Sequence, residues 1–269
     1  MSKERGIFQF DPESTMWEVN RYRPVLLAGG RALHMQIAHP LIAQAVKDSG
    51  FLERNPRKRL QSTARAGIDL IYGTPEISHA VADRINTIHG LTQGVLEETT
   101  GAHPAGERYD ARDQKLLAWV AATLIDSSIV GYETFVKSLT DEEKDKYVQD
   151  TKKLFSLVNL EPSSLPSSYK GLTSYIHEMI DSEQVKVGGL ARELAPYTIL
   201  SHARISRILM YGMRTITIYL LPKELQEQFG YTMPAWEKEL VQKFASAVKK
   251  SVPHLPSLVV EFKQSRDAH

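Results

Sequence analysis

The residues Leu116-Leu-Ala-Trp-Val-Ala-Ala-Thr-Leu-Ile-Asp-Ser127 indicate a helix at the centre of the fold. This stretch is apolar almost all round a helical projection, and we expect it to form the middle of a helix over residues 111–137. Asp110 and Asp113 suit the first turn of that helix, where a carboxylate meets the positive end of the helix dipole. A helix that is apolar on every side belongs at the centre of a fold, so other helices should surround it.

Helical signals recur on both sides of this stretch, and no sustained apolar–polar alternation with turn chemistry predicts a sheet. Thr74 and Pro75 are typical of a helix start, and Thr140 with Glu143 matches a capping box that opens another helix. We expect further helices at about 24–45, interrupted at Gly29–Gly30 or Pro40, and at about 56–72, 169–183, 189–195, 199–221 and 234–250.

The chain of 269 residues carries no repeat, low-complexity segment or linker. We therefore predict an all-α fold, a single-domain multi-helix bundle over residues 1–269 around the central apolar helix. Residues 1–20 look like an N-terminal arm, in which Phe8, Phe10 and Trp17 would be the packing anchors.

Composition excludes several classes of function. The formal net charge is +1, from 33 basic and 32 acidic side chains, so nothing indicates a nucleic-acid partner or an anionic membrane. The absence of cysteine excludes disulfides, thiolate-ligated haem, iron–sulfur clusters and a cysteine nucleophile. We see no secretory signal, and the longest apolar stretch is about half of a spanning helix, so we expect a cytoplasmic protein with no transmembrane segment. A peripheral contact with a membrane is the alternative that these observations leave open. The sequence does not fix an oligomeric state, and a homodimer is one that it allows.

His89 is the histidine of greatest interest. It lies four residues after Ile85 on an apolar seam of helical spacing, which comprises Ile77, Val81, Ile85, Ile88, Thr92 and Val95. On spacing alone, a buried neutral histidine bonded to a carbonyl is the favoured interpretation. The alternative is an axial haem ligand, which requires a neutral imidazole in an apolar pocket.

Arg59 and Thr63 are four residues apart and so share a helix face. Facing inward, they could polarise bound dioxygen or a substrate oxygen, whereas a solvated arginine and a hydroxyl bonded back to the helix are the simpler interpretation. Asp126 interrupts the central helix and needs a partner, for which Arg204, Arg207 and Arg214 are the candidates.

Other patterns are weaker. Glu76 and His79 form only one of the two Glu-x-x-His motifs that a helical di-iron site requires, so they are better read as surface residues. Gly29–Gly30 lacks the surrounding pattern of a phosphate-binding loop and favours a helix kink.

An ordered series of motifs from about Gly30 to Ile180 resembles the family that includes the mpaB-type oxygenases and the rubber oxygenase (latex clearing protein). The matching residues are Arg31-Ala-Leu-His-Met-Gln-Ile-Ala-His-Pro40, Phe51, Arg59-Leu-Gln-Ser-Thr63, Tyr72-Gly73, Ile88-His89, Gly94, Tyr109, Asp110, the stretch Leu116–Ser127, Tyr132-Glu133 and Leu165-Pro166.

The resemblance implies haem b, with its iron held by an axial histidine, in an all-α fold with a haem pocket. It carries the axial role to His89 and the distal role to Arg59 and Thr63. His39 matches the His-Pro motif and is assigned to the pocket, beside haem, with a structural role at a helix end as the alternative. Rubber-oxygenase-type members also use a distal lysine and a glutamate base. Ser62 stands where that lysine would fall and Ala43 near that glutamate, and Ala121 replaces a histidine of many relatives.

Three hypotheses follow. The first is an oxygenase that uses haem and dioxygen on a small apolar substrate such as a prenyl compound or another alkene. The second is a non-catalytic protein that binds haem or a hydrophobic ligand. The third is a haem-free helical interaction protein in which the histidines only pack.

Overall fold

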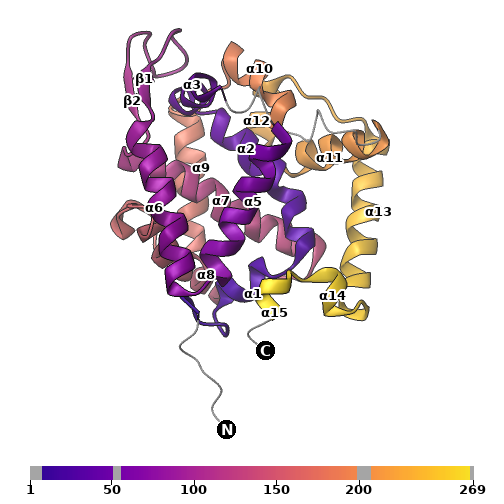
Figure 1. Ribbon diagram of the computed structural model, residues 1–269. Helices are drawn as coiled ribbons and strands as arrows, with labels where there is room; N and C mark the ends of the chain where they lie inside the picture. The colour runs from indigo at the N-terminus through magenta and orange to yellow at the C-terminus, as the bar shows by residue number, and fades with distance from the viewer. Residues whose placement is uncertain (1–7, 51–55, 199–206, 267–269) are drawn as a thin grey trace.

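The computed structural model describes residues 8–50, 56–198 and 207–266, with residues 56–61 as backbone only. The described chain is mostly helical, as predicted (Figure 1). Its α-helices are α1 (Thr15–Asn20), α2 (Gly29–Ile37), α3 (Pro40–Ser49), α5 (Pro56–Tyr72), α6 (Pro75–Leu91), α7 (Gln114–Phe135), α8 (Asp141–Ser156), α9 (Tyr169–Asp181), α10 (Gly189–Thr198), α11 (Arg207–Leu220), α12 (Lys223–Phe229), α13 (Ala235–Ser251), α14 (Ser257–Val260) and α15 (Lys263–Arg266). Short 3-10 helices cover Arg23–Ala28 (η1), Pro162–Ser164 (η2) and Val252–His254 (η3).

The central helix is α7, which begins three residues later than predicted because Asp113 caps it by accepting a hydrogen bond from the Lys115 amide. Its side chains are buried on nearly all sides, among them Trp119, Ile125 and Ile129. By length and composition alone α7 would suffice to cross a membrane, but 72% of its most apolar window is buried inside the protein. Buried core helices of soluble proteins meet the same criterion, so the burial of α7 accounts for its composition.

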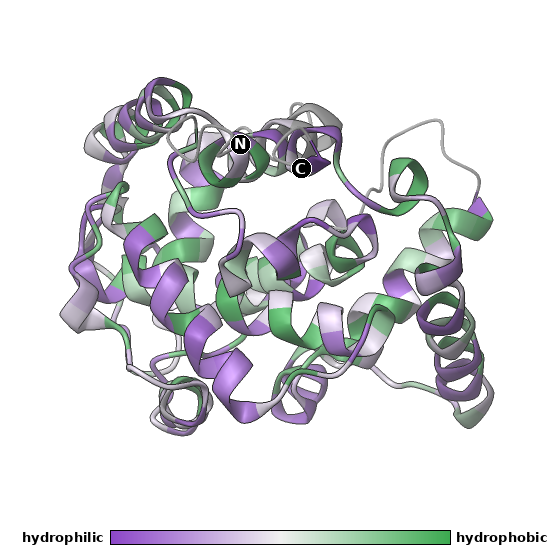
Figure 2. Ribbon diagram, turned by 90° about the horizontal axis from the view of Figure 1, so that it is seen from below, coloured by the Kyte–Doolittle hydropathy of each residue, from purple (hydrophilic) through white to green (hydrophobic). Residues whose placement is uncertain are grey.

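Around α7, the other helices pack at several angles, and each shows one apolar side. Seen from below, hydrophobic and hydrophilic segments alternate along the helices, as expected for amphipathic helices around a shared core (Figure 2). From Phe8 onward the N-terminal segment packs on this core, with Phe8 and Phe10 partly buried against it and Trp17 inside it, as predicted for these three side chains. Trp17 is fully buried in α1, with the ring of Phe8 at 5.2 Å and that of Tyr72 at 4.6 Å between centroids.

The helix predicted at 24–45 was expected to be interrupted at Gly29–Gly30 or at Pro40, and the structure has a break at each of these places. The segment divides into η1, α2 and α3, with the first break at Gly29 and the second at His39, whose backbone is extended before Pro40. Gly30 is required for close packing on α11, because a Cβ there would come within 2.2 Å of the Thr217 Oγ1.

Two expectations were wrong. The structure has a small antiparallel sheet, β1 (Gln93–Val95) with β2 (Arg108–Asp110), in which Gly94 pairs with Tyr109. Strands of three residues are too short to show an alternating pattern, so no periodicity indicates them. The helix before β1 therefore ends at Leu91, and Val95 does not continue its seam. Helix α12 was also unpredicted, because the segment after Pro222 was not assigned to any element.

Candidate functional site

The hairpin of α5 and α6 carries the three main candidate residues. The two helices pack along each other and are joined at Gly73, after which the Thr74 side chain caps α6. At 1.5 Å per residue, position 59 lies about 21 Å before the turn and position 89 about 24 Å after it. The hairpin thus brings Arg59 of α5 and His89 of α6 to a similar height.

The His89 side chain is half-buried near the C-terminal end of α6. Burial lowers the pKa of its imidazole, so the ring is neutral at pH 7. In the described part of the chain neither ring nitrogen makes a hydrogen bond, which differs from the carbonyl-bonded histidine favoured on spacing alone. The expected seam is only partly buried: Val81 and Ile85 pack against the core, whereas Ile88 is 55% exposed.

The two distal candidates differ in what the structure describes. Thr63 is exposed on α5, and its hydroxyl has no hydrogen-bond partner among the described residues. Ser62, at the position of the family's lysine, is exposed beside it. The Arg59 side chain lies outside the described residues, so its distal role stays a prediction.

His39 is buried where α2 ends and α3 begins, and its Nδ1 has no hydrogen-bond partner. Burial, together with the neighbouring His103, lowers the pKa of His39 to about 3. The two rings lie 4.9 Å apart between centroids. His103 is held by Glu107 at 3.0 Å and by the Gln184 carbonyl at 3.2 Å. The sequence interpretation missed His103 and Glu107, although their spacing of four residues in a glycine- and proline-rich loop was visible.

The polar residues of α2 and α7 form structural contacts. Asp126 pairs with Arg31, with 2.6 Å between Nη2 and Oδ2, rather than with Arg204, Arg207 or Arg214 as expected. Arg204 lies outside the described residues, and Arg207 and Arg214 make no ion pair with it. Asp126 therefore needs no cofactor or metal to balance its charge.

His34 is also satisfied by protein groups. Its Nδ1 lies 2.9 Å from the Gly30 carbonyl oxygen and 3.0 Å from the Thr198 hydroxyl, and its Nε2 lies 3.0 Å from the Tyr231 hydroxyl. Burial lowers its pKa to about 4. The neutral ring with its proton on Nδ1 satisfies these contacts, because the Tyr231 hydroxyl can then donate to Nε2.

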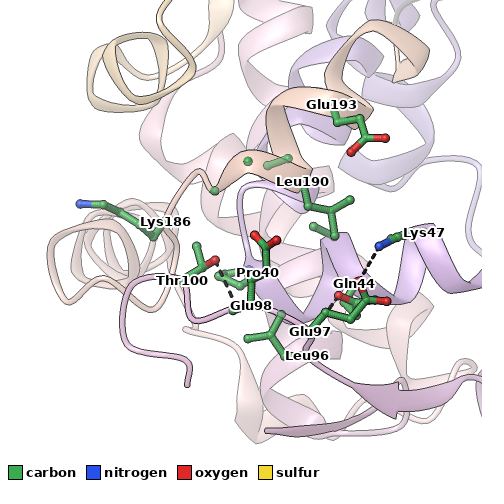
Figure 3. Close-up of a pocket in the computed structure, with 14 residues that line it drawn as sticks. Pro40, Gln44, Lys47, Leu96, Glu97, Glu98, Thr100, Lys186, Leu190 and Glu193 are labelled. Atoms are coloured by element: carbon green, nitrogen blue, oxygen red, sulfur yellow. Dashed lines mark hydrogen bonds and ion pairs between the residues drawn. The ribbon is translucent and has the colours of Figure 1, made fainter. Parts of the chain in front are cut away.

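A cavity of about 340 Å³ opens beside Pro40, between α3, the segment after β1 and the start of α10 (Figure 3). Ala43, Gln44 and Lys47 line it from α3, and Leu190 extends into it from α10. Lys47 is bound to Glu97 across one side at 2.6 Å, and Lys186 points away from the other labelled residues. The position near the family's glutamate, Ala43, therefore faces this cavity with a methyl group.

A haem that is bound through a single histidine requires one neutral imidazole in an apolar pocket. His89 fits the axial role in being neutral, partly desolvated and free at both nitrogens, although it lacks the hydrogen bond that usually orients an axial histidine. Glu76 and His79 are exposed, as expected for surface residues. Within the described ranges no three His, Asp or Glu side chains gather as a metal site.

Comparison with known proteins agrees with the motif series. A family model described as "ER-bound oxygenase mpaB/B'/Rubber oxygenase, catalytic domain" matches residues 17–250. This span includes all of the candidate residues, the central helix and the hairpin of α5 and α6.

Two mycobacterial proteins are similar to part of the chain. They are the uncharacterized protein Mb2261 of Mycobacterium bovis and the uncharacterized protein Rv2237 of Mycobacterium tuberculosis, each 25% identical over 155 residues. The aligned segment covers 56% of this chain and 58% of each relative. No solved structure matches the chain.

Proposed function

Because the chain belongs to the family of the ER-bound oxygenase mpaB/B' and rubber oxygenase catalytic domain, we propose that it is a haem b-dependent oxygenase that uses dioxygen to oxidise a small apolar substrate. The observation that carries the haem assignment is the His89 imidazole, which is neutral, partly desolvated and without a hydrogen bond in the described part of the chain.

In this proposal His89 binds the iron, and α6 holds the ring in place through Val81 and Ile85, which pack on the core. The haem, when bound, supplies the activation of dioxygen. Thr63 would donate a hydrogen bond to dioxygen or to an oxygen atom of the substrate. Arg59, on the same helix face, would stabilise negative charge on that oxygen. His39, whose low pKa keeps it neutral, would offer its unpaired Nδ1 as a hydrogen-bonding group for the cofactor or the substrate.

The identity of two residues supports a second candidate function, in which the protein binds haem or a hydrophobic ligand without turnover. Ala43 is buried and Ser62 carries a hydroxyl, so neither position supplies the carboxylate or ammonium group of rubber-oxygenase-type members. Gln44 does not replace the glutamate as a base, because an amide has no basic carboxylate. Rubber cleavage by the mechanism of those members is therefore not part of the proposal.

The decisive experiment is an absorption spectrum of the full chain, expressed with a haem precursor and recorded oxidised, reduced and under carbon monoxide. We expect a strong Soret band that His89→Ala removes or shifts. His79→Ala is the matched control, because His79 is an exposed histidine on the same helix. A colourless wild type that folds normally would contradict the proposal.

Oxygen uptake separates the two candidates. An oxygenase consumes dioxygen with at least one member of a panel of alkenes and phenols, and Thr63→Ala lowers that rate while the Soret band stays. A haem protein that never consumes dioxygen across the panel is the non-catalytic binder. The cytoplasmic location stays a prediction.

A further inference from the structure

One side of the protein exposes an unusual number of large apolar side chains. On α13, Trp236, Leu240 and Phe244 recur every four residues, so they form a single stripe along the helix. Leu255 and residues of α14 extend the stripe, because Leu255 and Val259 line one groove with Phe244. We call the result the α13 face, which comprises Trp236, Leu240, Phe244, Leu255, Leu258 and Val259. Each of these side chains is at least 42% exposed.

Helix α13 has a second apolar stripe that already packs against the protein. Val241 and Ala245 are buried in a cluster with Phe135 of α7 and Ile216 of α11. The exposed stripe lies next to this buried one, so it is not needed to hold α13 in place. Helix α13 lies at the edge of the molecule in Figure 1. Trp236 and Phe244 touch Tyr211 and Phe135 along one side, and the rest of each ring is exposed among the described residues.

The size of the α13 face matches that of a protein interface. Weighted by exposed fraction, its six residues present on the order of 600 Å² of surface, at the upper end of the roughly 300–600 Å² of the largest apolar patch on a typical monomer. A standard interface buries about 800 Å² on each partner. The face is therefore large enough for a specific association.

The α13 face has an exposed tryptophan at one end and an apolar groove at the other. Trp236, near the N-terminus of α13, is 58% exposed, and its ring rests on Tyr211 with the two planes at 13°. The far end holds an apolar groove of about 450 Å³, lined by Leu27, Phe244, Val252, Leu255 and Val259 among others. Sixteen residues separate Trp236 from Val252, about 24 Å along the helix axis.

We propose that the α13 face is a homodimer interface, in which two copies of α13 pack antiparallel about a two-fold axis near Phe244. Such an axis places position 236 of one copy level with position 252 of the other. Trp236 of each copy then enters the apolar groove of its partner, and one symmetric contact buries both tryptophans.

Two of the three charges on one edge of the stripe, Glu239 and Lys250, fit the same axis, and the third, Lys243, lies beside the axis. Glu239 and Lys250 lie on the same edge of the stripe, at opposite ends of α13. In an antiparallel pair the same edges meet in reverse order, so Glu239 of one copy lies level with Lys250 of the other. Lys250 makes no ion pair with any described residue of its own chain. Among the described residues, Glu239 makes one ion pair, with Lys243 at 3.7 Å, and both side chains of that pair are exposed.

A lipid surface would also accept exposed tryptophan, leucine and phenylalanine, but a concave groove and a reversed charge pattern are features of a protein partner. A bilayer surface has no fixed side chain that enters the groove and no cation at a fixed position opposite Glu239. The structure therefore favours a second copy, and lipid binding becomes an outcome of the test.

The first test measures the oligomeric state of the full chain by sedimentation equilibrium and light scattering. We expect a dimer at micromolar concentration and a roughly thirtyfold weaker dimer for Leu240→Glu. Leu91→Glu is the control, because Leu91 is 80% exposed on α6, outside the face. A wild type that stays monomeric at all concentrations overturns the proposal, and so does monomeric protein that binds anionic vesicles through the face.

The second test fixes the register. Glu239→Lys and Lys250→Glu should each weaken the dimer, and the double charge reversal should restore it. Because the chain has no cysteine, Glu239→Cys combined with Lys250→Cys should form a disulfide-linked dimer, whereas each single variant should not. Within one chain the two positions are about 16 Å apart along the helix, too far for a disulfide. Additive charge effects, or no cross-link in a confirmed dimer, would overturn this register.

Discussion

Arg31 of α2 and Asp126 of α7 form an ion pair inside the protein, with both side chains almost fully buried. The remaining polar atoms of the pair are bound as well. Arg31 donates to the Ser127 hydroxyl and to the Leu220 carbonyl, each at 2.7 Å, and the Tyr169 hydroxyl donates to Asp126 at 2.8 Å. The pair thus joins the central helix to α2, α9 and the end of α11.

Breaking this pair should strongly destabilise the fold. Asp126→Ala leaves a buried guanidinium without its counter-charge, and we expect a loss of about 3–5 kcal/mol in the free energy of unfolding. Urea denaturation followed by circular dichroism measures it. Glu97→Ala, which removes a pair exposed to solvent, should cost no more than about 1 kcal/mol. Equal costs for the two variants would show that the buried pair has no special role.

The sequence predicted Asp126 as a group in need of a partner, but it did not predict which partner. Periodicity identifies the burial of a carboxylate on α7, whereas the partner depends on the angle at which α2 crosses α7. Arg31 was quoted only as part of a family motif. The same limit applies to His39, whose neighbour His103 is 64 positions away and is brought to it by the sheet that the sequence did not reveal.

Helix existence was more predictable than the site. The central helix, the capped starts at Thr74 and Thr140, and the break before Pro40 were all visible, because local chemistry determines them. The candidate site depends on which sides of α5 and α6 face each other. Ile88, assigned to the apolar seam, is exposed, because a sequence pattern gives the spacing of a stripe but not the neighbours that cover it.

Acid should weaken the fold in a window set by His34. Burial lowers its pKa from an unfolded value of about 6.5 to about 4, so the unfolded chain binds a proton that the folded chain excludes. His34 therefore contributes stability that is complete above pH 6.5 and is lost as the pH falls toward 4, on the order of 3 kcal/mol in total.

Urea midpoints measured between pH 7.5 and 5 check this effect, because most carboxylates titrate below that range. His34→Gln should lower the slope of the unfolding free energy against pH by the equivalent of one proton taken up on unfolding. His177→Gln, which changes an exposed histidine, should leave that slope as in the wild type. His39, with a pKa lowered to about 3, acts in the same direction, so a residual slope in His34→Gln is expected. A wild type whose stability is constant from pH 7.5 to 5 would contradict the assignment of both rings as buried and neutral.

The turn between α5 and α6 should control both stability and cofactor binding. A Cβ at Gly73 would lie 2.3 Å from the Asp69 carbonyl oxygen and 2.8 Å from Ile77, so Gly73→Ala must displace the backbone where the hairpin reverses. We expect a loss of about 1–3 kcal/mol and a lower haem content, since the displacement changes how position 59 faces position 89. Gly67→Ala is the matched control, because Gly67 lies in α5 and a Cβ there would meet no atom within 4 Å. This variant should raise the free energy of unfolding by about 1 kcal/mol. The ratio of Soret to protein absorbance reports haem content, and urea denaturation reports stability. If Gly73→Ala retained both values of Gly67→Ala, the hairpin would not be what positions the two candidate residues.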